Sequence, residues 1–196
     1  MKRVVWGVLS TAKIGRERAL PGMKKSDLIE LRAIASRDEA RARSTADALG
    51  IPKAYGSYEA LLADPEIEAI YNPLPNHLHV PLTLQAAAAG KHVLCEKPIA
   101  LTAQEATELR AAAGKVLIAE AFMVRFHPQW LRARELVREG RIGTLRAVQM
   151  FFGYNNPDPA NVRNMAEIGG GGLYDIGCYA IVAGRFFLGA EPTRGI

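Results

Sequence analysis

The chain has 196 residues, of which 49% are hydrophobic and 23% charged, and its formal net charge is +5. Its apolar stretches are too short to cross a bilayer and its basic residues are not interleaved with aromatics, so we expect neither a membrane protein nor a nucleic-acid binder. The N-terminus leaves no room for a secretory signal, and Cys95 and Cys178 lack metal-ligand spacing. We therefore expect a cytoplasmic globular protein without a metal, in which a polyanionic ligand accounts for part of the positive charge.

The first predicted strand is the apolar run Val4 to Leu9, which is typical of a parallel strand buried on both faces. The turn from Ser10 to Gly15 stands where a dinucleotide fold carries its G-x-G-x-x-G, before a helix expected through about Met23. Only the third glycine is present, yet small residues at the other two positions leave backbone N–H groups accessible to phosphate. Taken alone, the segment fits a phosphate-binding turn and an ordinary strand-turn-helix equally well.

The second predicted strand, Leu28 to Ala35, ends in Ser36-Arg37-Asp38, at the position that reads the cofactor ribose. NAD sites usually place an acid there, whereas an arginine nearby accommodates the 2′-phosphate of NADP. Because Arg37 stands at the strand end and Arg41 follows in the next helix, we expect NADP rather than NAD. In the alternative, Ser36 or Asp38 caps the helix from about Glu39 to Leu49 and the arginines form its solvated face; both interpretations can hold together.

The alternation of strands and helices continues and predicts parallel βαβ units. Further strands are expected at Ala54–Tyr55, Ala69–Tyr71, His92–Cys95 and Val116–Ala119, and further helices at about Tyr58–Ala63, Leu78–Ala89 and Ala103–Ala113, the last capped by Thr102. The proline-stiffened loop from Asn72 to His77 follows a strand, at the edge where open α/β sheets bind ligands. We predict one doubly wound parallel sheet over residues 1–121.

The tripeptide Glu96-Lys97-Pro98 follows the strand that begins at His92. Proline cannot donate a ladder hydrogen bond, so Pro98 ends the strand. Lys97 is thereby expected at the carboxyl edge of the sheet, where its ammonium can reach a bound small molecule.

Residues 122–196 differ in character and are predicted to form a second domain. We expect a helix from about Gln129 to Arg138, a long alternating strand from Leu145 to Phe152, and a helix from Leu173 to Leu188. The run Gly169–Gly172 opens this last helix. Successive glycines are costly to order, which indicates close backbone approach to a ligand or to the sheet, although a flexible linker fits the composition equally well.

Together these motifs resemble the Gfo/Idh/MocA oxidoreductases, in the branch of glucose-fructose oxidoreductase, NADP-dependent xylose dehydrogenase and dimeric dihydrodiol dehydrogenase. The resemblance rests on residues 7–15, 36–38, 71–77, 96–98, 120–128 and 169–179, and it extends over nearly the whole sequence. It implies a Rossmann domain followed by an α+β domain with a mainly antiparallel sheet that commonly forms a homo-oligomer interface. Because family members continue past Ile196, we expect the second domain to be incomplete and the sequence to be truncated at its C-terminal end.

By position, the resemblance makes Lys97 the catalytic lysine, Asp175 the carboxylate of a D-x-x-x-H/Y motif and Tyr179 the acid/base. Tyr179 would take a hydroxyl proton as hydride leaves for nicotinamide, while Lys97 holds the developing oxyanion. Asp175 and Tyr179 share one face of the predicted helix. Without the resemblance, Asp175 is better explained as an acid at a helix N-terminus and Tyr179 as a core aromatic.

The expected reaction is hydride transfer between NADP and a hydroxyl of an aldose or vicinal diol. The alternative is a nucleotide-binding regulatory or scaffold protein of the same fold. The resemblance implies substrate contacts from Arg125, His127, Arg163, Asp175 and Tyr179. It implies cofactor contacts from Ser10, Thr11, Ala12, Ile14, Gly15, Ser36, Arg37, Arg41, Pro73, Leu74, Asn76, His77, Glu96 and Lys97.

Overall fold

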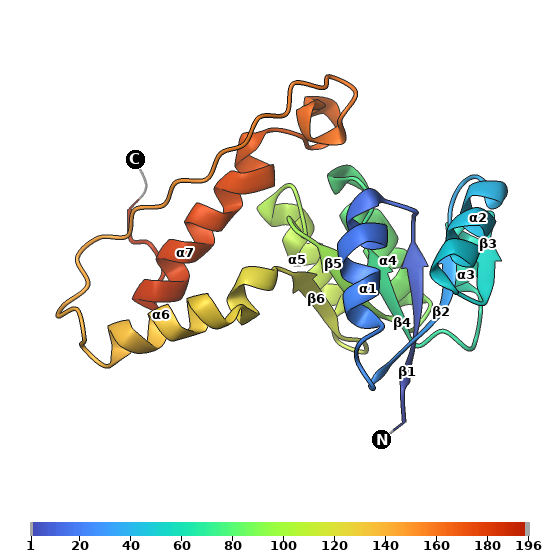
Figure 1. Cartoon of the computed structure of the whole chain (residues 1–196), viewed down its shortest axis with the longest axis horizontal. Coiled ribbons are helices and arrows are strands. Elements are labelled where there is room, and N and C mark those ends of the chain that lie inside the picture. Colours follow the sequence, from blue (N-terminus) through green and yellow to red (C-terminus); the bar gives the residue numbers. More distant parts are fainter. Residues whose placement is uncertain (1, 195–196) are drawn as a thin grey trace. The chain divides into compact units, whose positions relative to one another are not determined.

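The computed structural model describes residues 2–194 and divides into two units, Met1–Ala121 and Phe122–Ile196. The first is coloured blue to green in Figure 1, and the second yellow to red. Within the described residues, no helix combines the length and apolar character needed to span a membrane.

The first unit is built on a six-stranded sheet in the order β3-β2-β1-β4-β5-β6, and every neighbouring pair is parallel. The strands are β1 (Val4–Leu9), β2 (Ile29–Ala35), β3 (Lys53–Tyr55), β4 (Ala69–Asn72), β5 (His92–Glu96) and β6 (Ile118–Ala121). This order is that of the doubly wound dinucleotide-binding fold, and it confirms the predicted α/β class. The winding direction reverses between β1 and β4, where such folds bind their ligands.

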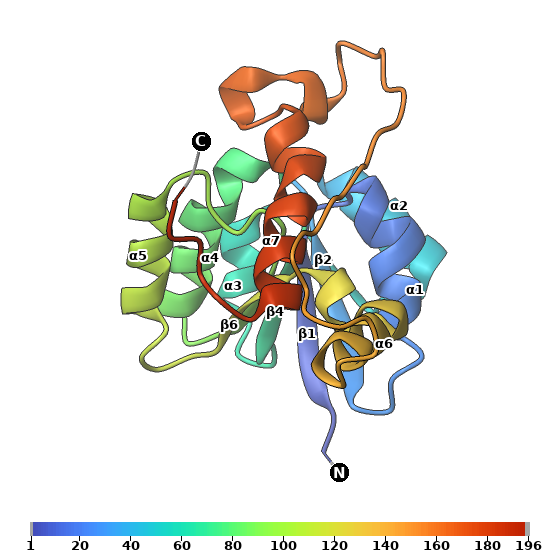
Figure 2. The same ribbon diagram turned by 90° about the vertical axis from the view of Figure 1, so that its left-hand side faces the viewer.

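Helices cover both faces of this sheet (Figure 2). On one face, α1 (Leu20–Met23) and α2 (Glu39–Leu49) pack on Val8 and Ile34. On the other, α3 (Tyr58–Leu62) and α4 (His79–Ala88) pack on Leu9 and Ile70, and α5 (Ala103–Ala112) lies beside α4. Adjacent residues of β1 therefore bury side chains on opposite faces, which explains why its sequence is apolar throughout.

Polar side chains fix where three of these helices begin. The Asp38 carboxylate accepts a hydrogen bond from the Arg41 backbone N–H at 3.1 Å, and the Ser57 hydroxyl caps α3 in the same way. Thr102 and Glu105 form a reciprocal capping box at α5, as the sequence predicted for Thr102. Asp38 thus confirms the capping interpretation, and its carboxylate is engaged at the helix start.

Charged side chains gather at the amino ends of the strands, opposite the predicted site. Asp64 accepts hydrogen bonds from the Lys53 ammonium at 2.9 Å and from the Tyr55 hydroxyl at 2.7 Å. The buried ammonium of Lys91 donates to the backbone carbonyls of Asp64 and Ile67 at 2.8 and 2.7 Å. These contacts join the starts of β3, β4 and β5.

We expect Asp64 to make the fold sensitive to acid. Burial alone would raise the pKa of Asp64, but the hydrogen bonds from Lys53, Tyr55 and the Glu66 backbone outweigh it and lower the pKa to about 2. Since this pKa lies below the unfolded value, the ionised carboxylate stabilises the fold above about pH 4, and that contribution is lost as pH falls through about 2. Between pH 5 and pH 2, the free energy of unfolding measured with urea should fall by about 1 kcal/mol more in the wild type than in Asp64→Asn. The exposed variant Asp47→Asn should behave like the wild type.

The second unit contains α6 (Pro128–Arg138) and α7 (Cys178–Leu188), joined by irregular segments and short helical turns. Trp130 of α6 packs on the rings of Phe186 and Phe187 of α7, with centroids 5.5 and 5.4 Å apart. The α7 helix continues directly from a π-helical turn, Leu173–Gly177, so the helix predicted over residues 173–188 is formed.

The strand predicted from Leu145 to Phe152 is wrong, because residues 145–152 have no regular secondary structure. Alternation indicates that a segment can present two different faces, but a strand forms only where a neighbour completes its hydrogen-bond ladder. No described residue of the second unit supplies that neighbour, and Phe151 is 94% exposed. The antiparallel sheet implied by the resemblance is therefore not seen in the described part of this unit.

Candidate active site

The turn after β1 has a positive φ at Ser10, which stands at the position of the first glycine of a dinucleotide fingerprint. Ser10 has φ +96°, a left-handed conformation in which glycine is free and serine is strained by about 1 kcal/mol or more. Its hydroxyl accepts the Ala12 backbone N–H at 3.0 Å, and its own N–H donates to the Ala35 carbonyl at 2.9 Å. These two hydrogen bonds fix the conformation of the turn and attach it to the end of β2.

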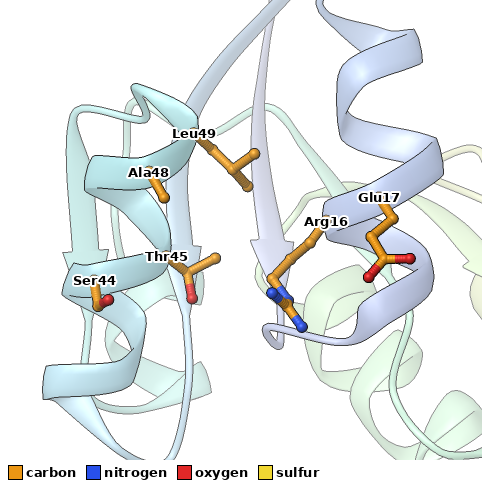
Figure 3. Close-up of a pocket in the computed structure, with 6 residues that line it drawn as sticks. All are labelled: Arg16, Glu17, Ser44, Thr45, Ala48 and Leu49. Carbon is orange, nitrogen blue, oxygen red and sulfur yellow. The ribbon is translucent and has the colours of Figure 1, made fainter.

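The helical segment after this turn contains a π-helical turn, Gly15–Ala19. Gly15 is buried, and a Cβ placed on it would lie 3.7 Å from both Tyr71 and Pro73, which shows how closely the turn approaches β4. Arg16 reaches back so that its Nε donates to the Thr11 carbonyl at 2.9 Å. Figure 3 shows this arginine across from Thr45 and Leu49 of α2, over a hollow of about 240 Å³ within the helix layer. Arg16 therefore stiffens the turn.

The end of β2 presents a serine and two arginines. Ser36 is buried, and its hydroxyl accepts the Asp38 backbone N–H at 3.3 Å. Arg37 and Arg41 are exposed. Burial raises the pKa of the nearby Tyr58 phenol, and the positive charge of Arg37 opposes that shift. Because the Asp38 carboxylate already caps α2, the guanidiniums are the groups available to a ligand at this strand end.

The loop after β4 is anchored by buried polar contacts. Asn72 is fully buried, and its amide donates to the His79 carbonyl at 3.2 Å and to the Thr83 hydroxyl at 3.3 Å. Its side-chain oxygen accepts the Leu74 backbone N–H at 3.3 Å. Pro73 and Leu74 are buried, Asn76 is half-buried and His77 is exposed, so the loop turns outward toward its end.

The end of β5 carries Glu96 and Lys97, both half-buried. The Tyr71 hydroxyl donates to the Glu96 carboxylate at 2.6 Å, and burial together with that carboxylate raises the pKa of Tyr71 well above its usual value. The Lys97–Pro98 peptide bond is cis, and the Ile99 N–H donates to the Glu120 carboxylate at 2.9 Å. Glu96 is thus held by β4, and Lys97 lies at the carboxyl edge of the sheet, as predicted. The neighbouring Cys95 is a fully buried core residue, and this burial raises the pKa of its thiol to about 12.

In the second unit, the Asp175 carboxylate accepts from Arg163 Nε at 3.1 Å and from the Tyr154 hydroxyl. Partial desolvation and the hydrogen bond to Asp175 raise the pKa of Tyr154. Tyr179 follows in α7, only 8% exposed, and its ring packs on Phe122 and Phe152 at centroid distances of 4.9 and 5.4 Å. The aromatic core interpretation thus holds for the Tyr179 ring, while its hydroxyl remains the predicted reactive group.

The glycine run is an ordered structure. The N–H groups of Gly170 and Gly171 donate to the carbonyls of Met165 and Arg163 at 2.8 and 2.7 Å. The run therefore packs on the turn that carries Arg163 and not on the sheet, its approach to a ligand stays a prediction, and these hydrogen bonds speak against a flexible linker. Arg163 and Asp175 face each other as a result.

Two further residues predicted to bind substrate lie just after residue 121. Arg125 is exposed in a short 3₁₀ turn, Met123–Phe126. His127 caps α6, because its Nδ1 accepts the Gln129 backbone N–H at 3.2 Å. Their contact with a substrate stays a prediction.

Two family models match the chain: an oxidoreductase family with an NAD-binding Rossmann fold over residues 4–118, and a GFO/IDH/MocA C-terminal domain over residues 130–195. The chain belongs to the Gfo/Idh/MocA oxidoreductase family. This confirms the resemblance on which the site residues depend.

Relatives within the Gfo/Idh/MocA family include a D-xylose 1-dehydrogenase (NADP(+)) of Haloferax volcanii, 47% identical over 97% of this chain and 59% of the relative. A trans-1,2-dihydrobenzene-1,2-diol dehydrogenase of Xenopus laevis is 39% identical over 90% of this chain and 54% of the relative. A 3-ketoreductase from Actinomadura kijaniata, solved as a variant with TDP-benzene and NADP, aligns at a TM-score of 0.87 and 36% identity over 97% of this chain and 59% of that one. The chain thus spans between 54% and 59% of the length of these three proteins.

Some contacts at this Gfo/Idh/MocA site were not predicted from the sequence. Tyr71 holds Glu96, Tyr154 holds Asp175, and His79 is fully enclosed between two loops. Tyr71 stands within the motif at residues 71–77 and His79 beside it, but Glu96 and Pro98 lie too far along the chain for spacing to indicate these contacts. Tyr154 precedes a polar loop and carried no signal.

Proposed function

We propose that the protein is an NADP-dependent oxidoreductase that transfers hydride between nicotinamide and a hydroxyl of an aldose or vicinal diol. This proposal rests on the groups gathered at the carboxyl edge of the sheet. There the strained Ser10 turn, the arginines after β2 and Lys97 after β5 belong to one compact unit. A dinucleotide laid along this edge would meet backbone N–H groups, guanidiniums and an ammonium.

The end of β2 supports NADP over NAD. An acid that binds the ribose 2′-hydroxyl would favour NAD, but the Asp38 carboxylate is engaged by the Arg41 backbone N–H. Arg37 and Arg41 instead supply positive charge suited to a 2′-phosphate. The Haloferax relative and the Actinomadura structure are both named with NADP, which agrees with this preference.

The residue roles follow from their chemistry. Bound NADP would supply the hydride acceptor. Tyr179 would take the proton from the substrate hydroxyl, and the Lys97 ammonium would stabilise the negative charge that develops on that oxygen. Asp175 is engaged by Arg163 and Tyr154, so we assign it to orienting the substrate and these neighbours rather than to accepting the proton. The reaction requires Lys97 and Tyr179 to meet at one substrate, which stays a prediction.

The substrate class rests on the relatives, which are named for xylose, a dihydrodiol and aldoses. A homo-oligomer and a cytoplasmic location also stay predictions. Exposed apolar side chains of the second unit outside the candidate site, Val148 and Phe151, would suit the oligomer interface expected there.

The test is a cofactor titration followed by a substrate screen. NADPH fluorescence should show binding, and screening pentoses, hexoses and dihydrodiols should show oxidation with NADP at least about tenfold more efficient than with NAD. Arg37→Ala should reduce that preference by raising the KM for NADP, with little change for NAD, because it removes a partner of the 2′-phosphate alone. Binding without oxidation of any substrate would favour a regulatory or scaffold protein and refute the enzyme.

A further inference from the structure

His79 is the first residue of α4, and its side chain is enclosed between the two loops that carry the candidate site. Only 1% of its surface is exposed. Its Nε2 lies 2.7 Å from the Leu74 carbonyl oxygen, and its Nδ1 lies 2.7 Å from the Pro98 carbonyl oxygen. One imidazole ring therefore bridges the loop after β4 and the loop after β5.

Each of these carbonyls stands beside residues assigned to function. Leu74 belongs to the loop that leads to Asn76 and His77, which are predicted to bind the cofactor. Pro98 directly follows Lys97, which is predicted to act on the substrate. The imidazole thus spans the distance between a cofactor loop and a catalytic loop.

We propose that His79 is a positioning residue that sets the cofactor loop and the Lys97 loop relative to each other through its two ring nitrogens. This inference rests on the proposed function for the roles of the two loops. The bridge itself rests only on contacts within the first unit.

Hydrogen bonds anchor both the backbone of His79 and the loop beyond Pro98. The Asn72 amide donates to the His79 backbone carbonyl, and Thr83 in the next turn of α4 receives the second Asn72 bond. On the far side, the Glu120 carboxylate accepts the Ile99 N–H, which anchors the chain just beyond Pro98. The ring is therefore fixed at its backbone, and both of its targets belong to anchored loops.

A neutral imidazole cannot donate a hydrogen bond to both carbonyls. A carbonyl only accepts hydrogen bonds, and a neutral imidazole has a single N–H, so only the imidazolium donates to both. Burial lowers the pKa of His79 by more than the two carbonyls and the carboxylates of Glu96 and Glu120 raise it, so near neutral pH the ring is neutral, donates to one carbonyl and only contacts the other. The ring is rigid in either form, so it keeps the spacing of the two loops.

The two arms can be removed separately. The side-chain nitrogen of asparagine lies close to the place of the imidazole Nδ1, whereas that of glutamine lies close to the place of Nε2. His79→Asn therefore keeps the arm to Pro98 and loses the arm to Leu74, and His79→Gln does the reverse.

We expect opposite kinetic signatures from the two variants. His79→Asn should weaken NADPH binding, measured by fluorescence, by about tenfold while kcat at saturating cofactor stays within about threefold. His79→Gln should lower kcat by about tenfold or more while the Kd for NADPH stays within about threefold, because it misplaces Lys97. Equal effects of both variants on both quantities, or no effect of either, would overturn the proposal.

Lys91→Met provides the matched control. Lys91 is also buried, and its ammonium also joins two backbone carbonyls, but at the amino ends of the strands. It should lower the thermal midpoint as the His79 variants do, with Kd and kcat unchanged. If Lys91→Met weakened NADPH binding or lowered kcat to the same extent, the effects of the His79 variants would reflect stability alone.

A measurement on the unaltered protein serves if the variants do not fold. In the ¹⁵N-histidine-labelled protein, NADPH should shift both ring nitrogens of His79 but not those of His92, whose Nδ1 accepts the Leu117 N–H at the amino edge of β5. Unchanged His79 resonances at saturating NADPH would refute the bridge. Absence of turnover in the wild type would instead refute the proposed function, and the binding arm of the test would still decide the role of His79.

Discussion

Replacing Tyr179 by phenylalanine is expected to lower kcat for aldose or diol oxidation by about 10²- to 10³-fold, because it removes the proposed proton acceptor. Affinity for NADPH should change by less than about threefold, since the cofactor residues lie in the other unit. The ring itself is retained, and it keeps its packing on Phe122 and Phe152. Steady-state kinetics with the best substrate from the screen, together with NADPH fluorescence, measure both quantities.

Tyr174→Phe is the matched control for this change. It removes a hydroxyl from the same helical segment as Asp175, at a half-buried position to which we assign no role in the reaction. We expect kcat to stay within about twofold of the wild type. Turnover by Tyr179→Phe at the wild-type rate would end the assignment of Tyr179 as proton acceptor. An equal fall in kcat in both variants would mean that the effect comes from a disturbed helix.

The first unit could be predicted almost wholly from the sequence, because its signals are local. Apolar runs such as Val4–Leu9 mark strands buried on both faces, and Asp38 and Thr102 mark helix starts by chemistry that acts within one turn. The proline of residues 96–98 likewise places Lys97 at a strand end. Each of these predictions needed only a few neighbouring residues.

The errors and omissions have a common cause in partners distant along the chain. Residues 145–152 alternate correctly, but no described neighbour completes a ladder. The contacts of His79 with Pro98 and of Tyr154 with Asp175 exist because the fold brings distant residues together. The convergence of Lys97 with Tyr179 depends on the arrangement of two units, and it stays a prediction that the kinetics of the variants test.

Gly170→Ala is expected to destabilise the second unit by about 3 kcal/mol. A Cβ on Gly170 would lie 2.6 Å from the Met165 carbonyl oxygen and 2.8 Å from both the Arg163 carbonyl oxygen and the Met165 nitrogen. All of these are backbone atoms, so no side-chain rotation can relieve the clash, and the turn that carries Arg163 must move. Urea unfolding measures the loss directly.

The same change should reach the chemistry through Arg163. Once its turn moves, Arg163 no longer meets Asp175 with the present 3.1 Å contact, and we expect kcat to fall by about tenfold or more. Gly172→Ala is the control, because Gly172 has φ −60° and a Cβ there meets no atom within 4 Å. Alanine at 172 should leave stability unchanged or raise it by about 0.5 kcal/mol, because it restricts the unfolded chain. If Gly170→Ala matched Gly172→Ala in both stability and kcat, the glycine run would not hold Arg163 against Asp175, and the assignment of Asp175 as an orienting residue would fail with it.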